Sequence, residues 1–129
     1  MISSPIDEIK NQARENGFNK FHWSFRTELQ DGVLDETLNY LETSGYDSAL
    51  CQFQVHSGDP FVQASYMASK TDRLKYMVAL RPYAMTPAYA RMMSDSFIQL
   101  YDERLMLNMV VGTFNDENNN LFLNSQTTL

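Results

Sequence analysis

The stretch LKYMVALRP, residues 74–82, decides the fold of this chain. It is a nearly continuous apolar run from Leu74 to Leu80, and Arg81-Pro82 ends it. A short run without polar alternation is typical of a strand that is covered on both faces, as in a parallel sheet. Thr86-Pro87 then gives a cap-plus-proline signal, which predicts a helix. A second apolar run, LMLNMVV at Leu105–Val111, follows and is predicted to be a further strand of the same kind.

The same alternation continues towards the N-terminus. Alternating aromatic residues predict a strand over 18–26, and the run SALCQF predicts another over 48–53. Leu34, Leu38 and Leu41 have helical spacing, and Asp59 followed by Pro60 predicts the start of a helix that runs to about residue 69. Strands that alternate with helices indicate parallel pairing through crossover connections. The predicted fold class is therefore α/β, and periodicity alone leaves an open sheet and part of a barrel as alternatives.

Composition narrows the class of function. The chain has 129 residues, 43% of them hydrophobic, and a net charge of -6. This size and apolar content fit one domain with a packed core, whereas the negative charge argues against nucleic acid and anionic membrane surfaces as partners. No apolar run reaches the ~18 residues of a membrane span, and the polar N-terminus is unlike a signal peptide. Cys51 is the single cysteine, so we expect no internal disulfide and a cytoplasmic setting.

The chain divides into three parts under this interpretation. Residues 1–17 are predicted to form a helical extension, with a polar helix over 5–16 that Gly17 ends. Residues 18–114 hold the strand–helix units, and residues 115–129 are a polar tail. All three belong to one predicted domain, 1–129.

Several motifs resemble the bacterial luciferase-like flavin-dependent monooxygenases, most closely the alkanesulfonate monooxygenases. They are the run at 74–82, the Thr86-Pro87 helix start, and RLMLNMVVG at 104–112. Further upstream, LETSGY at 41–46 and GDPF at 58–61 match the same family in order and spacing. The resemblance covers about residues 33–112 with few or no gaps.

This resemblance implies a (β/α)₈ barrel, of which this chain would supply the first four strands, that is, a partial TIM-type barrel. It implies reduced FMN as cofactor, or a deazaflavin as in some relatives, and dioxygen as co-substrate. The implied reaction is oxygen insertion into a small organic substrate such as a sulfonate. The alternative is a non-catalytic flavin-binding or oligomerisation module derived from that family.

Three residues are candidates for binding the flavin. Asn108 is an amide within an apolar strand, and the family carries Asn at this position; the other interpretation is a core amide with its own hydrogen bonds. Gly112 allows close approach of the backbone or simply ends the strand. Arg81 either shapes the flavin-facing rim or ends its strand. Val111 stands where the family has Thr, so one hydroxyl is missing at this edge.

The candidates for catalysis are His22, His56 and Ser57. Ser57 matches a cysteine near the substrate in alkanesulfonate monooxygenases, and Cys51, within the preceding strand, is predicted to be a buried apolar residue instead of its replacement. His56 is either an acid, base or sulfonate partner or a surface-loop histidine. His22 lies in the predicted first strand and faces either the barrel interior or a packed structural site.

The remaining expectations concern metals and partners. Two histidines and one cysteine without ligand spacing predict no metal site. The family takes much of its catalytic set from later strands, and four parallel strands leave open sheet edges. We therefore expect a homo-oligomer or a complementary C-terminal half-barrel chain, together with a flavin reductase or another supply of reduced flavin.

Overall fold

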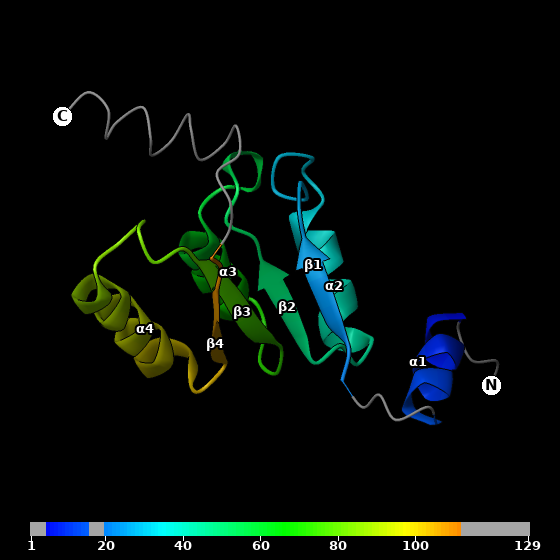
Figure 1. The fold of residues 1–129 in the computed structure, drawn as a ribbon. Coiled ribbons are helices and arrows are strands. Elements are labelled where there is room, and N and C mark those ends of the chain that lie inside the picture. Colours follow the sequence, from blue (N-terminus) through cyan, green and yellow to red (C-terminus); the bar gives the residue numbers. More distant parts are fainter. Residues whose placement is uncertain (1–4, 16–19, 112–129) are drawn as a thin grey trace.

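A computed structural model describes residues 5–15 and 20–111 of the chain. Within these residues, helices and strands alternate from end to end (Figure 1). The helices are α1 (Pro5–Glu15), α2 (Leu34–Thr43), α3 (Pro60–Ser69) and α4 (Pro87–Tyr101), and the strands are β1 (His22–Phe25), β2 (Ser48–Cys51), β3 (Lys75–Leu80) and β4 (Leu105–Met109). The predicted order is confirmed, although the strands over 18–26 and 48–53 are shorter than expected. One element was missed: the predicted loop 54–58 contains a short 3₁₀ helix, η1 (Val55–Ser57).

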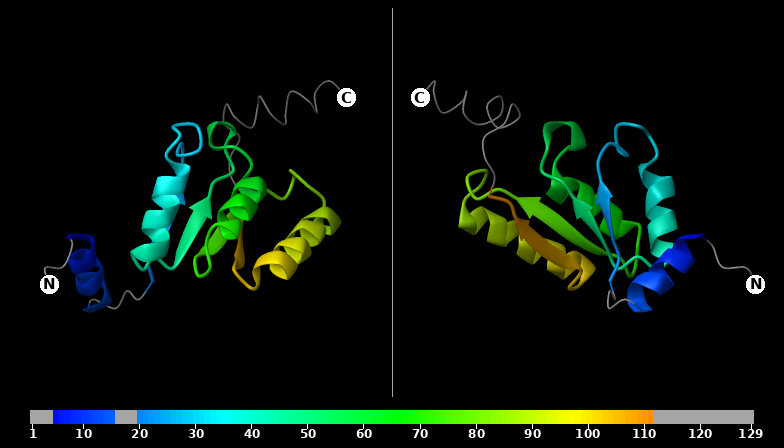
Figure 2. Two further views of the ribbon diagram at one scale, coloured as in Figure 1. Left: turned by 180° about the vertical axis from the view of Figure 1, so that it is seen from behind. Right: turned by 45° about the vertical axis from the view of Figure 1, so that its right-hand side comes forward.

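The strands form one parallel sheet in the order β1-β2-β3-β4. Helices α2, α3 and α4 lie on one face of this sheet, and none of the three covers the other face (Figures 1 and 2). An all-parallel sheet with a helix between successive strands is the arrangement of a partial TIM-type barrel, as predicted. The carboxyl ends of all strands therefore lie at one edge of the sheet.

Both predicted helix caps are present. The Asp59 carboxylate accepts a hydrogen bond from the backbone N–H of Val62 at 2.8 Å, and the Thr86 hydroxyl accepts one from Tyr89 at 3.2 Å. In each case proline occupies the first helical position, where its missing N–H leaves no intrahelical bond unmade. These two local signals fix where α3 and α4 begin.

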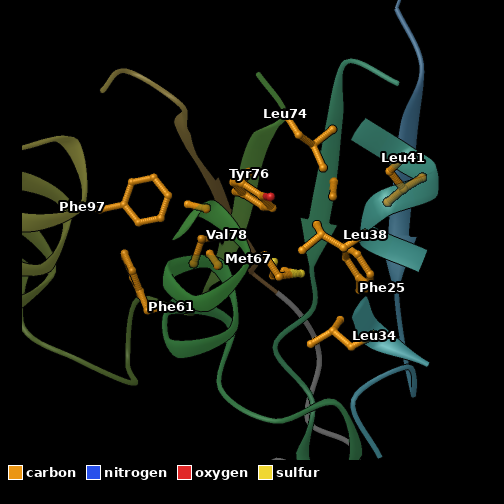
Figure 3. Close-up of a cluster of buried hydrophobic side chains, with 14 residues drawn as sticks. Phe25, Leu34, Leu38, Leu41, Phe61, Met67, Leu74, Tyr76, Val78 and Phe97 are labelled. Atoms are coloured by element: carbon orange, nitrogen blue, oxygen red, sulfur yellow. The ribbon is translucent and has the colours of Figure 1, made fainter. Parts of the chain in front are cut away.

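The hydrophobic core fills the space between the sheet and its helices (Figure 3). Strand alternation turns one set of side chains toward the helices, among them Phe25, Tyr76 and Val78. Leu38 and Leu41 of α2 pack against this set, as their spacing predicted. This core lies on the helix-facing side of the sheet, and the other side carries polar side chains together with apolar ones such as Met77 and the buried Ala79.

The apolar face of α4 lies only partly in the core. Five of its side chains line a groove of about 480 Å³ that runs between α3 and α4; they are Tyr89, Met92, Met93, Phe97 and Leu100. Only Phe97 of the five is buried. Strand β4 departs from prediction in the same way, because Leu107 and Met109 on its helix-facing side are 43% and 54% exposed. Burial on both faces holds for β3 but is wrong for β4, the edge strand of the described sheet.

At the amino end of the sheet, polar side chains are joined in a bonded network. The guanidinium of Arg104 donates hydrogen bonds to the Tyr101 carbonyl at 2.9 Å and to the Ala68 carbonyl at 2.8 Å. It also donates to the Leu74 carbonyl at 3.2 Å and to the Thr71 hydroxyl at 3.1 Å. Arg104 therefore ties the ends of α3 and α4 to the start of β3.

Glu42, on α2, holds the segment that leads into β3. Its carboxylate accepts backbone N–H groups from Arg73 at 2.8 Å, Asp72 at 3.0 Å and Leu74 at 3.0 Å. Partial burial by itself raises the pKa of Glu42, but these three N–H groups and the charge of Arg73 outweigh it, so the pKa is lowered. The carboxylate is thus favoured in its charged form.

Helix α1 is fastened at the same end through Lys10. The Lys10 ammonium donates to the Ser44 carbonyl at 2.8 Å and lies 5.0 Å from the ring centres of both Phe21 and Tyr46. A cation over aromatic faces is stabilised by the ring quadrupoles, so a charged side chain can be buried here. This contact joins α1 to the loop after α2.

Candidate functional site

The face of the sheet away from the helices carries the candidate site. Parallel register pairs Ala79 of β3 with Asn108 of β4, so both side chains point from this same face. Two residues beyond Ala79, Arg81 continues the alternation past the end of the strand. Two of the predicted flavin-binding residues, Arg81 and Asn108, are thus brought together at the carboxyl edge of the sheet.

These side chains border a cavity of about 200 Å³, hereafter the Arg81 cavity. Its lining comes from the carboxyl ends of β2, β3 and β4 and consists of Leu50, Gln52, Phe53, Gln54, Ala79, Arg81, Asn108 and Val110. The set combines three amides, one cation and apolar walls, and it contains no carboxylate. A mostly apolar hollow with a few convergent polar groups is the usual form of a small-molecule site.

Arg81 differs from the other residues of this cavity because it is a buried cation. It is only 8% exposed, and its Nε and Nη1 atoms have no hydrogen-bond partner in the part of the chain that the structure describes. The guanidinium carbon lies 5.8 Å from the centre of the Phe53 ring, which gives a cation–π contact but no hydrogen bond. Buried donors without acceptors are rare in folded proteins and call for an explanation.

The amides around Arg81 are partly engaged. Gln52 donates from Nε2 to the Ser24 hydroxyl at 2.7 Å, which links β2 to β1 on this face of the sheet. Gln54 forms an isolated backbone bridge with Gly58, which closes the η1 loop. Asn108 is half-buried beside them. The cavity therefore presents donors and acceptors that the fold itself does not fully use.

Comparison with known families gives one match. Residues 27–122 match the luciferase-like monooxygenase family. The chain belongs to this family. The match includes every part of the Arg81 cavity and extends beyond the resemblance found in the sequence at both ends, whereas the narrower assignment to alkanesulfonate monooxygenases is a prediction.

Ser57, which matches the family's substrate-side cysteine, lies in η1 and does not line the Arg81 cavity. Its side chain is fully buried, and its hydroxyl has no hydrogen-bond partner within residues 5–15 and 20–111. The Gln63 amide donates to its backbone carbonyl. His56, its neighbour, is exposed on the same short helix. The catalytic roles of both residues stay predictions.

Cys51 is buried on the helix-facing side of β2, as predicted. Burial, with a smaller effect of the Asp59 charge, raises the pKa of the Cys51 thiol to about 12. A thiol that stays protonated is a poor nucleophile. Cys51 therefore does not replace the thiol that this luciferase-like chain lacks at position 57.

His22 lies at the opposite end of the sheet from the Arg81 cavity. It opens β1 and its Nδ1 pairs with the hydroxyl of Ser48, the first residue of β2. Three residue steps at ~3.3 Å each separate it from Phe25, where β1 ends. In barrels of this type the chemistry takes place at the carboxyl ends, so this placement does not support the predicted catalytic role of His22.

Gly112, the third predicted flavin-binding residue, lies outside the described residues, so its placement is not tested. Its neighbour Val111 is strongly exposed. Sequence reasoning missed Gln52, Phe53 and Gln54 as members of the cavity. A signal existed, because Leu50, Gln52 and Gln54 share the two-residue alternation of β2 and turn polar where the strand ends.

Two absences hold for residues 5–15 and 20–111. No three His, Cys, Asp or Glu side chains among them gather closely enough to hold a metal ion. Within the same ranges, no helix combines the length and apolar character that a membrane crossing needs.

Proposed function

We propose that this chain forms the flavin-binding wall of an FMNH₂-dependent monooxygenase that inserts one oxygen atom into a small organic substrate such as a sulfonate. One observation carries the proposal: in a chain matched to the luciferase-like monooxygenases, the Arg81 cavity lies at the carboxyl ends of parallel strands. This is the edge at which TIM-type barrels carry out their chemistry.

The residues of the cavity fit a flavin ring. Phe53, Leu50 and Val110 offer apolar surface to a flat aromatic system, and Asn108 offers both a donor and an acceptor to its polar edge. When bound, reduced flavin supplies the electrons that activate dioxygen. The protein residues then have two tasks: Asn108 orients the ring, and the apolar walls exclude water from it.

The chain supplies only part of such a site. A cavity of about 200 Å³ is smaller than the ~300–1,000 Å³ typical of ligand pockets. Strand β4 pairs only with β3 in the described sheet, and Leu107 and Met109 beside its outer edge are exposed. We propose that a second copy of this chain or a complementary half-barrel chain completes the wall, and that a flavin reductase or another source delivers reduced FMN.

Anaerobic titration with reduced FMN, followed by measurement of oxygen uptake, tests the proposal. We expect saturable binding that Asn108→Leu weakens roughly tenfold, because a polar contact to the ring is lost. Asn39→Leu, the same change on the exposed face of α2, is the matched control and should leave binding unchanged. Absence of binding at high micromolar concentration would contradict the proposal.

A second candidate function is a non-catalytic flavin-binding or oligomerisation module. It is favoured by the chemistry of the cavity, whose lining within residues 5–15 and 20–111 contains no histidine, cysteine or acid that could move a proton. The enclosed hydroxyl of Ser57 adds to this, since it stands apart from the cavity. Binding of flavin with no oxygen uptake, alone and with the completing chain, would identify this second function.

A further inference from the structure

The buried guanidinium of Arg81 carries an inference about ligand charge. Arginine stays protonated in proteins, so the cavity holds a permanent positive charge. Its side chain is more than nine-tenths buried, and Nε and Nη1 have no acceptor within the described residues. Burying a charge without a partner is strongly unfavourable, and such a charge is normally met by an anion or by hydrogen bonds.

No acidic group among residues 5–15 and 20–111 lines this cavity. The adjoining hollow, which shares Phe53 and Gln54 with it, includes one acidic residue of these ranges, Asp59. The Asp59 carboxylate is already engaged as the cap of α3 through the Val62 N–H. In a protein of net charge -6, the described part of the cavity is thus a local positive site.

A purely structural task does not account for this side chain. Arg81 ends β3, and the turn that follows uses its backbone carbonyl, which accepts the N–H of Ala84 at 2.9 Å. Any residue supplies that carbonyl. The contact with the Phe53 ring also needs no more than part of the guanidinium face. The N–H groups at Nε and Nη1 remain without an acceptor in the described residues.

We propose that the Arg81 cavity binds one oxyanion group of a small ligand, of the carboxylate, sulfonate or phosphate class. Arg81 donates N–H groups to the anion, and the amide of Asn108, which lines the same cavity, donates beside it. The evidence for an anion site is the burial of Arg81 and the lack of acceptors for its Nε and Nη1 atoms in the described residues. Its assignment to the substrate or to the phosphate of FMN rests on the proposed function.

Isothermal titration of the full chain with inorganic phosphate, acetate and methanesulfonate, at ionic strength held constant with chloride, tests the site. At least one of these anions should bind saturably. Arg81→Gln should weaken that binding roughly 10- to 100-fold, because a charge-assisted hydrogen bond is lost. Arg81→Lys should give an intermediate affinity, since it keeps the charge without the planar array of donors.

Arg91→Gln is the matched control. It removes the same charge from the exposed surface of α4, where Arg91 pairs with Asp95 at 3.6 Å, and it should leave anion binding unchanged. Three results would overturn the site: no saturable heat from any anion at tens of millimolar, equal binding by Arg81→Gln and the native chain, or equal losses in Arg81→Gln and Arg91→Gln. If Arg81→Gln fails to fold, Arg81→Lys decides alone, and unchanged affinity and stoichiometry of a folded lysine variant count against the site.

Competition then identifies which molecule carries the anion. If FMN displaces the bound anion and riboflavin does not, the group is the flavin phosphate. If neither displaces it, the group belongs to the substrate. Both results support an oxyanion site. A chain that binds the anion but no flavin would refute the proposed function and leave this site intact, so the two failures can be told apart.

Discussion

The two arginines that are buried in the described part of the chain differ in what surrounds them. Arg104, at the amino end of the sheet, is 9% exposed and donates to four acceptors. Arg81, at the carboxyl end, is 8% exposed, and two of its nitrogens have no partner among the described residues. The two side chains are buried to the same extent, but the Arg104 guanidinium is fully engaged in hydrogen bonds and that of Arg81 is not.

This difference separates an end of the sheet whose polar groups are hydrogen-bonded from the end at which we propose binding. Around Arg104, the helix ends, Thr71 and the start of β3 are bound to one another, and Glu42 and Lys10 add contacts nearby. Around Arg81, polar groups point into a cavity. TIM-type barrels divide their two ends in this way, with stability at the amino end and chemistry at the carboxyl end. The following predictions test whether the division is real.

Arg104→Met should give the largest effect. The substitution keeps the apolar stem but leaves three carbonyls and one hydroxyl without their donor, so the free energy of unfolding should fall by about 3–5 kcal/mol. Urea titration followed by circular dichroism measures this. Arg91→Met, at an exposed position, is the control and should change stability by less than about 0.5 kcal/mol. A loss at Arg104 no greater than this would remove the contrast between the two ends.

Glu42→Ala should destabilise by about 2–3 kcal/mol, because three backbone N–H groups lose a charged acceptor. Since the folded pKa lies below the ordinary 4.5, this stabilisation is present above that pH and declines as the pH falls below it. Unfolding measured at neutral and acid pH should therefore show the difference between the native chain and Glu42→Ala shrinking in acid. Glu36→Ala, on the exposed side of α2, should show a much smaller difference at every pH.

Local signals in the sequence predicted most of the fold. The Asp59-Pro60 and Thr86-Pro87 pairs gave the starts of two helices, because capping depends only on residues within one turn. The spacing of the leucines gave the buried face of α2. The apolar residues of α4 share one face, but periodicity does not show which neighbour covers such a face, and most of this one lines a groove.

The site was predictable in part and for a similar reason. Asn108 stood out as a polar residue within an apolar run, and Arg81 as the residue that ends one. That both lie on one face is seen only from the register of β3 and β4 in the structure. The sequence could not show that the Arg104 guanidinium has hydrogen-bond acceptors and that Nε and Nη1 of Arg81 have none. Both depend on atoms from elements more than twenty residues away in the sequence, such as Thr71 for the first and Phe53 for the second.

Cys51 offers a test by pH, because it lies on the side of β2 that faces the core. Its thiol has a folded pKa of about 12 against an ordinary 9.0, so stability is complete below pH 9 and is lost as the pH rises toward 12. At a pH of about 10.5 the native chain should lose about 2 kcal/mol more than Cys51→Ala does, relative to pH 8. Tyr76 is present in both proteins, and burial also raises its pKa; because the charge of Cys51 adds a smaller part to that rise, the contribution of Tyr76 cancels only in part in this difference. Equal alkaline losses would mean that the thiol is accessible in the folded chain.

Arg81→Met gives the smallest expected change and the sharpest test of the comparison. The substitution removes a buried charge whose Nε and Nη1 make no hydrogen bond in the described structure, and it keeps a stem that can pack on Phe53. The free energy of unfolding should stay the same or rise by about 1 kcal/mol, because an unfavourable burial of charge is relieved. The same urea titration used for Arg104→Met measures it, in a buffer with chloride as the only anion. If the free energy of unfolding falls by several kcal/mol, Arg81 stabilises the fold as Arg104 does. Its burial would then be no evidence for binding at the carboxyl end.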